Sequence, residues 1–178
     1  MMRLLNRAFR RAQLPVMFSE GFSPKMKLRL AWPLSVGMTS DKEYADVLLP
    51  QKIDVDLICK NLNKIMPSGC RIFDFRYINK KNPSLTEQVV SATWQIQTHE
   101  DVMSQMTEIQ LENNIKNVLQ QEDGSKVYLL TLPAGPKKNI SVTKMFPEAL
   151  SIHRVELQLI PVLNRKNNLV ACVIHSST

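Results

Sequence analysis

Cysteine is scarce in this sequence, and its placement excludes several kinds of site. The three cysteines, Cys59, Cys70 and Cys172, lie far apart and form no Cys-x-x-Cys pair. An odd number at such spacing is unlike a disulfide framework and does not provide the ligands of an iron–sulfur cluster. The three histidines are equally scattered, unlike the ligands of a zinc site. We therefore expect no metal, no cofactor and no catalytic residue set, and predict that the chain is not an enzyme.

Long hydrophobic runs are also missing. No apolar stretch approaches the roughly 20 residues that cross a bilayer. Arginines interrupt the first helix-like segment, unlike the apolar core of a secretory signal. We expect a cytoplasmic bacterial protein that associates with no membrane. Of the 178 residues, 44% are hydrophobic, which is enough to form the core of one large domain or two small ones.

Acidic residues are almost absent from the first part of the chain. Residues 1–30 contain five arginines and two lysines but only one acid, Glu20, which gives a net charge of +6 against +7 for the whole chain. A local excess of one sign produces a surface that attracts anions. The candidate residues for binding RNA or another anion are Arg3, Arg7, Arg10, Arg11, Phe22, Lys25, Lys27, Arg29, Lys137 and Lys138.

Most of these basic residues follow the periods of regular secondary structure. Residues 2–13 have apolar side chains on one helical face, while Arg3, Arg7 and Arg10 recur at i, i+4 and i+7 on another. Residues 25–32 begin by alternating between basic and apolar side chains, which predicts a strand with one basic face. Such a helix and strand could contact the phosphates of RNA. The alternative is that both faces are simply solvated, as in many surface elements.

Three other features are candidates for a site. Phe22 lies in a loop, where its ring could stack on a nucleobase. Residues 133–139 (PAGPKKN) form a loop whose turn and two lysines could bind an anion, but it lacks the Gly-Lys-Ser/Thr of a nucleotide-binding loop. Tyr44 and Asp46 lie on the same side of a predicted strand, where Asp46 could act as a base or nucleophile. The alternative for Asp46 is an outward side chain paired with a nearby Lys or Arg.

The first part of the chain has the element order α-β-β-α-β. After the first helix and strand, we predict a strand at 43–49, a helix at 54–66 and a strand at 70–78. This order is a ferredoxin-like (split βαβ) unit without its first strand, which lies inside the sheet in the complete topology. If the place of the missing first strand stayed open, the strands beside it would expose unpaired backbone groups. We expect it to be filled by a C-terminal strand, 152–160 or 169–175, or by a second molecule in a homo-oligomer.

The fold class that we predict is α+β, with two units of mainly antiparallel sheet over residues 1–80 and 81–178. In the second of these, residues 101–120 fit a helix or a strand equally well. Two strands at 152–162 and 168–175 are separated by a polar Asn-Arg-Lys-Asn segment, which is typical of a hairpin turn. The chain is therefore expected to end in a β-hairpin.

A series of short motifs occurs in order along the first half of the chain. They are the helix MRLLNRAFRRA, Ser19-x-Gly21-Phe22-x-Pro24, Glu43-Tyr44-x-Asp46, Leu62-Asn63, Pro67-x-Gly69 and Pro83-Ser84-Leu85. In these motifs the chain resembles the radical SAM-linked domain, a bacterial family of unassigned function found alone or fused behind radical S-adenosylmethionine proteins. The resemblance implies a radical SAM protein as a partner, and it implies no particular activity.

Two classes of function remain open. The first is a non-catalytic accessory or RNA-binding module, associated with radical SAM proteins or with tRNA- or ribosome-related processing, that acts through its basic N-terminal face. The second is an RNA-modifying enzyme with Asp46 as its reactive carboxylate. A basic face without a carboxylate favours the module, whereas a basic face that encloses a carboxylate cleft favours the enzyme.

Overall fold

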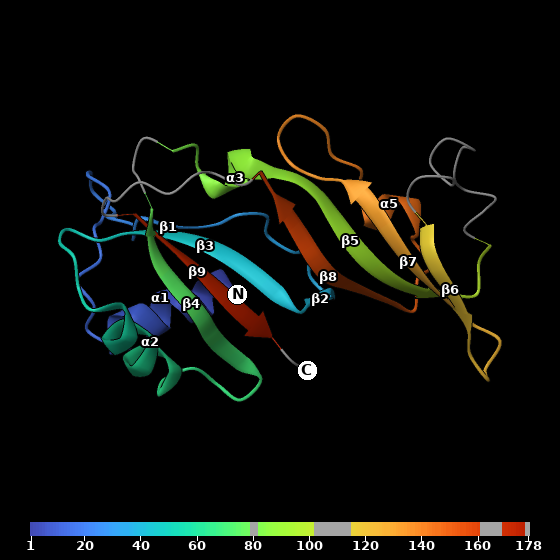
Figure 1. Ribbon diagram of the computed structural model, residues 1–178, viewed down its shortest axis with the longest axis horizontal. Helices are drawn as coiled ribbons and strands as arrows, with labels where there is room; N and C mark the ends of the chain where they lie inside the picture. The colour runs from blue at the N-terminus through green and yellow to red at the C-terminus, as the bar shows by residue number, and fades with distance from the viewer. Residues whose placement is uncertain (79–81, 102–114, 161–168, 177–178) are drawn as a thin grey trace. The chain divides into compact units, whose positions relative to one another are not determined.

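The computed structural model describes residues 1–78, 82–101, 115–160 and 169–176. These residues form two units, each built on its own sheet (Figure 1). The first unit comprises Met1–Pro33, Lys42–Gln88 and Ile160–Thr178, and the second comprises Leu34–Asp41 and Val89–Leu159. The units interleave in sequence and do not follow the expected division at residue 80. Within the described ranges, no helix has the length and apolar character needed to cross a membrane.

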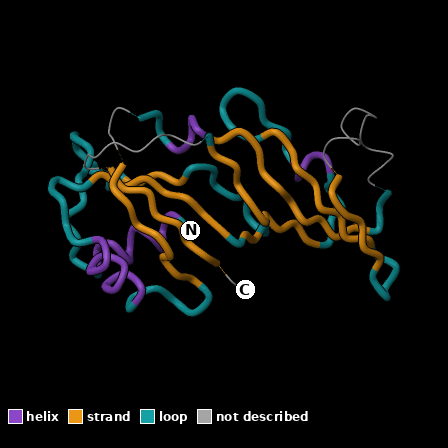
Figure 2. Tube along the Cα trace, viewed as in Figure 1, coloured by secondary structure: helices purple, strands orange, loops and turns teal. Residues whose placement is uncertain are grey.

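The first unit is a four-stranded antiparallel sheet with two helices packed beside it (Figure 2). The strand order is β1-β3-β9-β4. Its elements are α1 (Met2–Arg11), β1 (Leu28–Leu30), β3 (Lys42–Leu48), α2 (Val55–Asn63), β4 (Cys70–Ile78), the short α3 (Leu85–Gln88) and β9 (Leu169–Ser176). The order of elements expected over residues 2–78 is therefore present.

The last strand of the chain lies inside this first sheet. β9 pairs antiparallel with β3 on one side and with β4 on the other, so that Ala45 and Phe75 are both register partners of Cys172. The prediction that a C-terminal strand lies beside the strand at 70–78 is confirmed for the segment 169–175. The chain therefore fills this position itself.

The predicted C-terminal hairpin is wrong. β8 (Ser151–Leu159) belongs to the sheet of the second unit, whereas β9 belongs to the sheet of the first. The expected turn at 164–167 lies outside the described residues. Two strand-like stretches around a polar segment are typical of a hairpin. In this chain, however, β9 lies between β3 and β4, where both edges of β9 find backbone hydrogen-bond partners.

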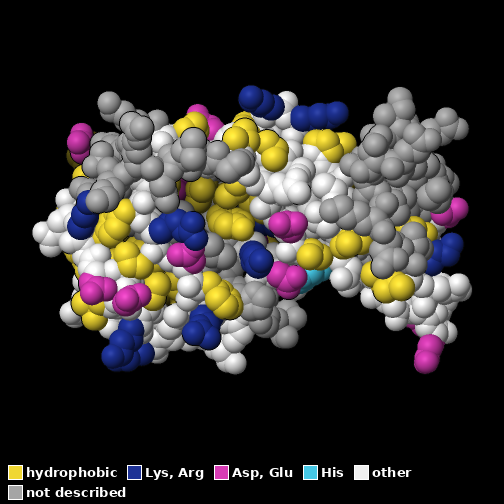
Figure 3. Space-filling view, in the orientation of Figure 1, with side chains coloured by type: hydrophobic (Ala, Val, Ile, Leu, Met, Phe, Trp, Pro, Cys, Tyr) yellow, Lys and Arg dark blue, Asp and Glu magenta, His cyan; other side chains and the backbone are white. Residues whose placement is uncertain are grey.

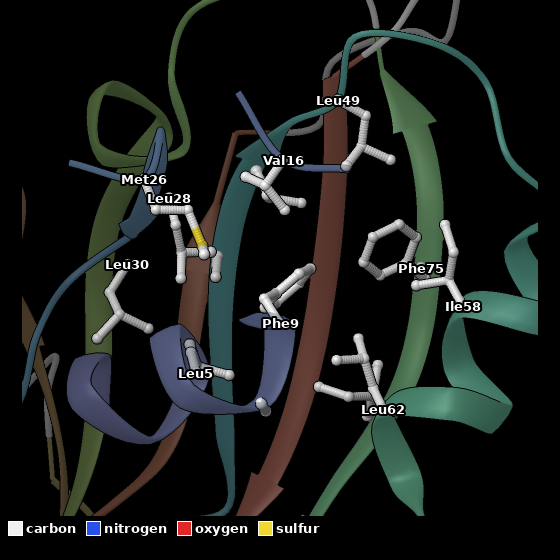
Figure 4. Packing of buried hydrophobic residues seen from close by; sticks show 14 residues of the cluster. Leu5, Phe9, Val16, Met26, Leu28, Leu30, Leu49, Ile58, Leu62 and Phe75 are labelled. Carbon is white, nitrogen blue, oxygen red and sulfur yellow. The ribbon is translucent and has the colours of Figure 1, made fainter. Parts of the chain in front are cut away.

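Sequence periodicity explains the core of the first unit. Leu5, Ala8 and Phe9 of α1 are buried, and the rings of Phe9 and Phe75 lie with centroids 6.5 Å apart (Figure 4). The apolar positions of the predicted strand at 25–32 join the same cluster, namely Met26, Leu28 and Leu30. Each fully buried Leu or Phe contributes about 1.5–3 kcal/mol to folding. This burial fixes which face of α1 is left for solvent.

The second unit is a five-stranded sheet with the order β2-β8-β5-β7-β6. β2 pairs with β8 in parallel, and the other neighbours pair antiparallel. Besides β8, its elements are β2 (Thr39–Ser40), β5 (Val89–Thr98), β6 (Ile115–Gln120), β7 (Lys126–Pro133) and the short α5 (Val142–Met145). The predicted α+β class with mainly antiparallel sheets is thus confirmed.

Three features of the second unit go beyond the sequence patterns. The end of the ambiguous segment 101–120 is a strand, β6, and residues 102–114 lie outside the described part of the chain. β2 and α5 were not predicted, because two and four residues are too short for a hydrophobic period to show.

Candidate anion-binding site

A hollow of about 430 Å³ lies in the first unit, between α1 and the segment that leads into β1. We call it the basic groove. Its cationic and amide side chains are Arg3, Asn6, Arg7, Arg10 and Lys25, and its apolar ones are Met2, Pro24, Met26 and Leu28. Among the residues that the structure describes, no carboxylate lines it. The basic groove therefore joins the two basic segments that the sequence analysis singled out.

The periodicity of α1 places the three arginines. Arg3, Arg7 and Arg10 are exposed, whereas Leu5 and Phe9 are fully buried. At 1.5 Å per residue, the three guanidinium groups are distributed over roughly 10 Å of helix axis. A rotation of α1 that turned any of these arginines inward would expose the buried side chains of α1 to solvent. The arginines therefore stay on the side of α1 that faces the groove.

The loop after α1 is closed by a pair of hydrogen bonds between its ends. The backbone N–H of Lys25 donates to the hydroxyl oxygen of Ser19 at 2.9 Å, and the N–H of Ser19 donates to the carbonyl oxygen of Lys25 at 2.8 Å. Phe22, at the tip of this loop, has an exposed fraction of 110%. The closed loop brings Lys25 to the basic groove and leaves the aromatic ring free in solvent.

The cations of the basic groove have no ion-pair partner in the described part of the chain. Among the described residues, none of Arg3, Arg7, Arg10 and Lys25 takes part in an ion pair, and α1 has no acid in its first turn. On the face shown in Figure 3, by contrast, basic and acidic side chains lie next to each other. Like charges gathered without counter-charges repel one another, and a bound anion would relieve that repulsion.

The remaining predicted basic residues lie outside this groove. Lys27, just before β1, and Arg29, within β1, are both exposed on either side of buried Leu28 in sequence, and neither lines the hollow. Arg11 is exposed at the end of α1 but does not line the hollow. Lys137 and Lys138 are exposed in the second unit, between β7 and α5. Four of the predicted cations are therefore brought together, and these five are not among them.

Asp46 is not an outward side chain, as one interpretation of the sequence expected. It is only 9% exposed, and its Oδ2 accepts the backbone N–H of Leu85 at 3.0 Å. Burial raises the pKa of Asp46, while the N–H of Leu85 and the charge of Arg29 oppose that rise. Tyr44, two residues earlier, is half-buried. Asp46 was expected at the surface because the segment that covers it, at the start of α3, is 39 residues away in sequence.

The raised pKa of Asp46 predicts a pH-dependent stability that Asp46→Asn removes. Folding favours the protonated carboxyl, because the pKa in the folded state is above its ordinary value of 3.8. The folded state thus binds more protons than the unfolded state, and its stability rises as the pH falls. We expect the free energy of unfolding of the wild type, relative to Asp46→Asn, to increase as the pH is lowered from 7 toward 4 in urea titrations.

Asp123 provides a control of opposite sign. The hydroxyl and the backbone N–H of Ser125 lower the pKa of Asp123, so the relative stability of the wild type over Asp123→Asn falls with falling pH. A difference between wild type and Asp46→Asn that stays constant or shrinks on acidification would contradict the account of Asp46.

A third group of polar side chains surrounds His153. His153 of β8 has its Nδ1 2.7 Å from the hydroxyl oxygen of Thr39 and its Nε2 3.1 Å from Oδ1 of Asp41. Since the carboxylate must accept from Nε2–H, the neutral ring accepts the Thr39 hydroxyl at Nδ1. The histidine ties β2 to β8, and its partners lie more than 100 residues away in sequence. In the described residues, no three His, Cys, Asp or Glu side chains are grouped as metal ligands.

A bacterial protein family matches most of the chain. A family model described as "Uncharacterized protein conserved in bacteria (DUF2344)" matches residues 1–166, which include the whole basic groove. No curated protein and no solved structure matches the chain. The family description contains no reference to radical SAM proteins, so that link stays a prediction.

Proposed function

Because the chain belongs to this family of uncharacterized proteins conserved in bacteria, we propose its function from the basic groove itself: a non-catalytic module that binds single-stranded RNA. The observation that carries the proposal is the gathering of Arg3, Arg7, Arg10 and Lys25 around one hollow, where the described part of the chain places no carboxylate. Arginine forks bind phosphate groups through paired hydrogen bonds, and a nucleic-acid strand presents phosphates in series.

The loop beside the basic groove supports a nucleic acid over a small anion. Phe22 lies three residues before Lys25, which lines the hollow, and its ring is fully exposed. Exposed aromatic rings next to a cationic groove are how proteins hold single strands, because every base can stack on them. An inorganic anion would gain nothing from this ring.

The alternative function, RNA modification with Asp46 as the reactive carboxylate, has less support. Such a carboxylate must reach the substrate, whereas Asp46 is 9% exposed and one of its oxygens is bonded to the N–H of Leu85. It also does not line the basic groove. The described geometry is better explained if Asp46 anchors the start of α3.

The cellular setting that we propose rests on the resemblance of the N-terminal motifs. We propose that this RNA-binding module acts in the cytoplasm as an accessory to a radical SAM protein, in tRNA- or ribosome-related processing. Recovery of the tagged protein from cells, followed by identification of the proteins that come with it, tests this part separately from RNA binding.

Direct titration tests the binding proposal. We expect saturable binding of a fluorescent single-stranded RNA of about 12 nucleotides, followed by anisotropy, with closely similar affinity in the wild type and in Asp46→Asn. The two proteins should agree because Asp46 is buried outside the groove. Absence of saturable binding in the wild type would refute the RNA-binding module, and loss of binding in a folded Asp46→Asn protein would return Asp46 to the site.

A further inference from the structure

The basic groove extends along α1. Its lining residues on this helix begin in the first turn and end in the last, and the segment 24–28 contributes the other side. Arg3, Arg7 and Arg10 therefore follow one another along the groove, over roughly 10 Å of helix axis. A stacked nucleic-acid strand carries one phosphate about every 3.4 Å of its length. The row of arginines thus corresponds to about three or four successive phosphates.

The surface that the groove offers to a ligand is mainly cationic. The three arginines and Lys25 are exposed, whereas Met26 is 9% and Leu28 3% exposed, so these two apolar side chains offer little area. Four cations around one hollow repel one another, and a phosphate relieves that repulsion while a neutral base does not. The amide of Asn6, in the same hollow, can also donate to a phosphate oxygen. The groove therefore favours the backbone of a strand over its bases.

The exposed ring of Phe22 lies outside the hollow. Phe22 is not among the lining residues, and the hydrogen bonds between Ser19 and Lys25 close the loop that carries it. A base can stack on this ring only if it points away from the groove. Stacking covers the face of a base and leaves its hydrogen-bonding edge open.

We infer that the basic groove binds the backbone of the strand, over about three or four successive phosphates along α1, and leaves the bases outside. This inference rests on the proposed function and defines the segment of RNA that the site takes. The protein then holds the strand without covering the edges of its bases, which stay open to a second molecule.

The length of the bound segment gives the first test. In anisotropy titrations with strands of about 2 to 12 nucleotides, we expect affinity to rise steeply up to about four or five nucleotides. Beyond that length it should increase only with the number of registers in which a strand can bind. A rise that continues just as steeply beyond about eight nucleotides would overturn the inference, because phosphates outside the groove would then be bound.

Two adjacent arginines of α1 provide a matched pair of variants. Arg10 lines the groove, whereas Arg11 is exposed at the same end of the helix and does not line it. Arg10→Gln should weaken binding about fivefold at 0.1 M salt and make the slope of log affinity against log salt shallower by about 0.7. Arg11→Gln makes the same change in charge and should alter both by much less. Equal effects in the two variants would contradict the path along α1.

The openness of the bases is tested by methylation. Dimethyl sulfate modifies N1 of adenine and N3 of cytosine, which lie on the hydrogen-bonding edges. In a saturated complex with a 12-nucleotide strand of these two bases, we expect reactivity within about twofold of that of the free strand. Protection of several neighbouring bases would place them in the groove and overturn the inference, while the RNA-binding module stands. If no strand binds at all, the proposed function fails and the inference fails with it.

Discussion

Reversing Arg3, Arg7 and Arg10 to Glu is expected to weaken RNA binding at least about 100-fold at 0.1 M salt. Each phosphate contact on a single strand adds about 0.7 to the slope of log affinity against log salt. Three contacts therefore raise the affinity by about two orders of magnitude when the salt concentration falls from 1 M to 0.1 M. The repulsion from three new carboxylates adds to this loss. The fold should survive, because all three side chains are exposed while Leu5 and Phe9 form the buried face of α1.

A matched control separates the groove from the total charge. Lys60, Lys64 and Lys144 are exposed and do not line the basic groove. Reversing them to Glu changes the net charge by the same amount, and we expect a loss of less than about fivefold, from long-range electrostatics alone. Equal losses in the two triple variants would show that RNA binding depends on net charge and not on the groove.

Replacing Gly135 with Ala is expected to destabilise the second unit by about 3 kcal/mol or more. Gly135 has φ +115°, and a Cβ at this position would lie 2.2 Å from the carbonyl oxygen of Val89. That carbonyl is backbone at the start of β5 and cannot rotate away as a side chain would. The loop 133–139 must move to relieve the clash. This movement would weaken the 3.1 Å hydrogen bond that the N–H of Ala134 donates to the carbonyl oxygen of Val90.

Gly124 provides the control for backbone strain alone. It has φ +81°, but a Cβ there would have nothing within 4 Å. Gly124→Ala should therefore cost only about 1 kcal/mol, the penalty for a left-handed backbone in a residue with a Cβ. Urea unfolding of both variants gives the comparison. Equal destabilisation would mean that the close approach of Gly135 to Val89 does not matter for the fold.

The basic groove was largely predictable because it is local. The period of α1 and the alternation from Lys25 to Leu30 each determine which side chains are buried, and both lie within the first 30 residues. Burial of the two apolar faces against each other leaves the arginines of α1 beside Lys25. Asn6 was not predicted as a site residue, since a single amide among arginines carries no periodic signal.

The features that were missed depend on contacts between distant residues. The sequence of β9 fits a hairpin with β8 as well as the position between β3 and β4, and only the assembled sheet decides between them. Asp46 is buried, and the backbone N–H that bonds to its carboxylate belongs to Leu85, 39 residues away in sequence. His153 contacts Thr39, which lies 114 residues away, and no pattern in the sequence relates the two.

The salt dependence of RNA binding tests the central claim, that arginines of the basic groove bind phosphates of a nucleic-acid strand. If each of the four cations of the basic groove contacts one phosphate, the wild type should show a slope of log affinity against log salt of about −3, and the variant with Arg3, Arg7 and Arg10 reversed a slope shallower by about 2. A wild-type slope near zero, or the same slope in both proteins, would contradict the claim.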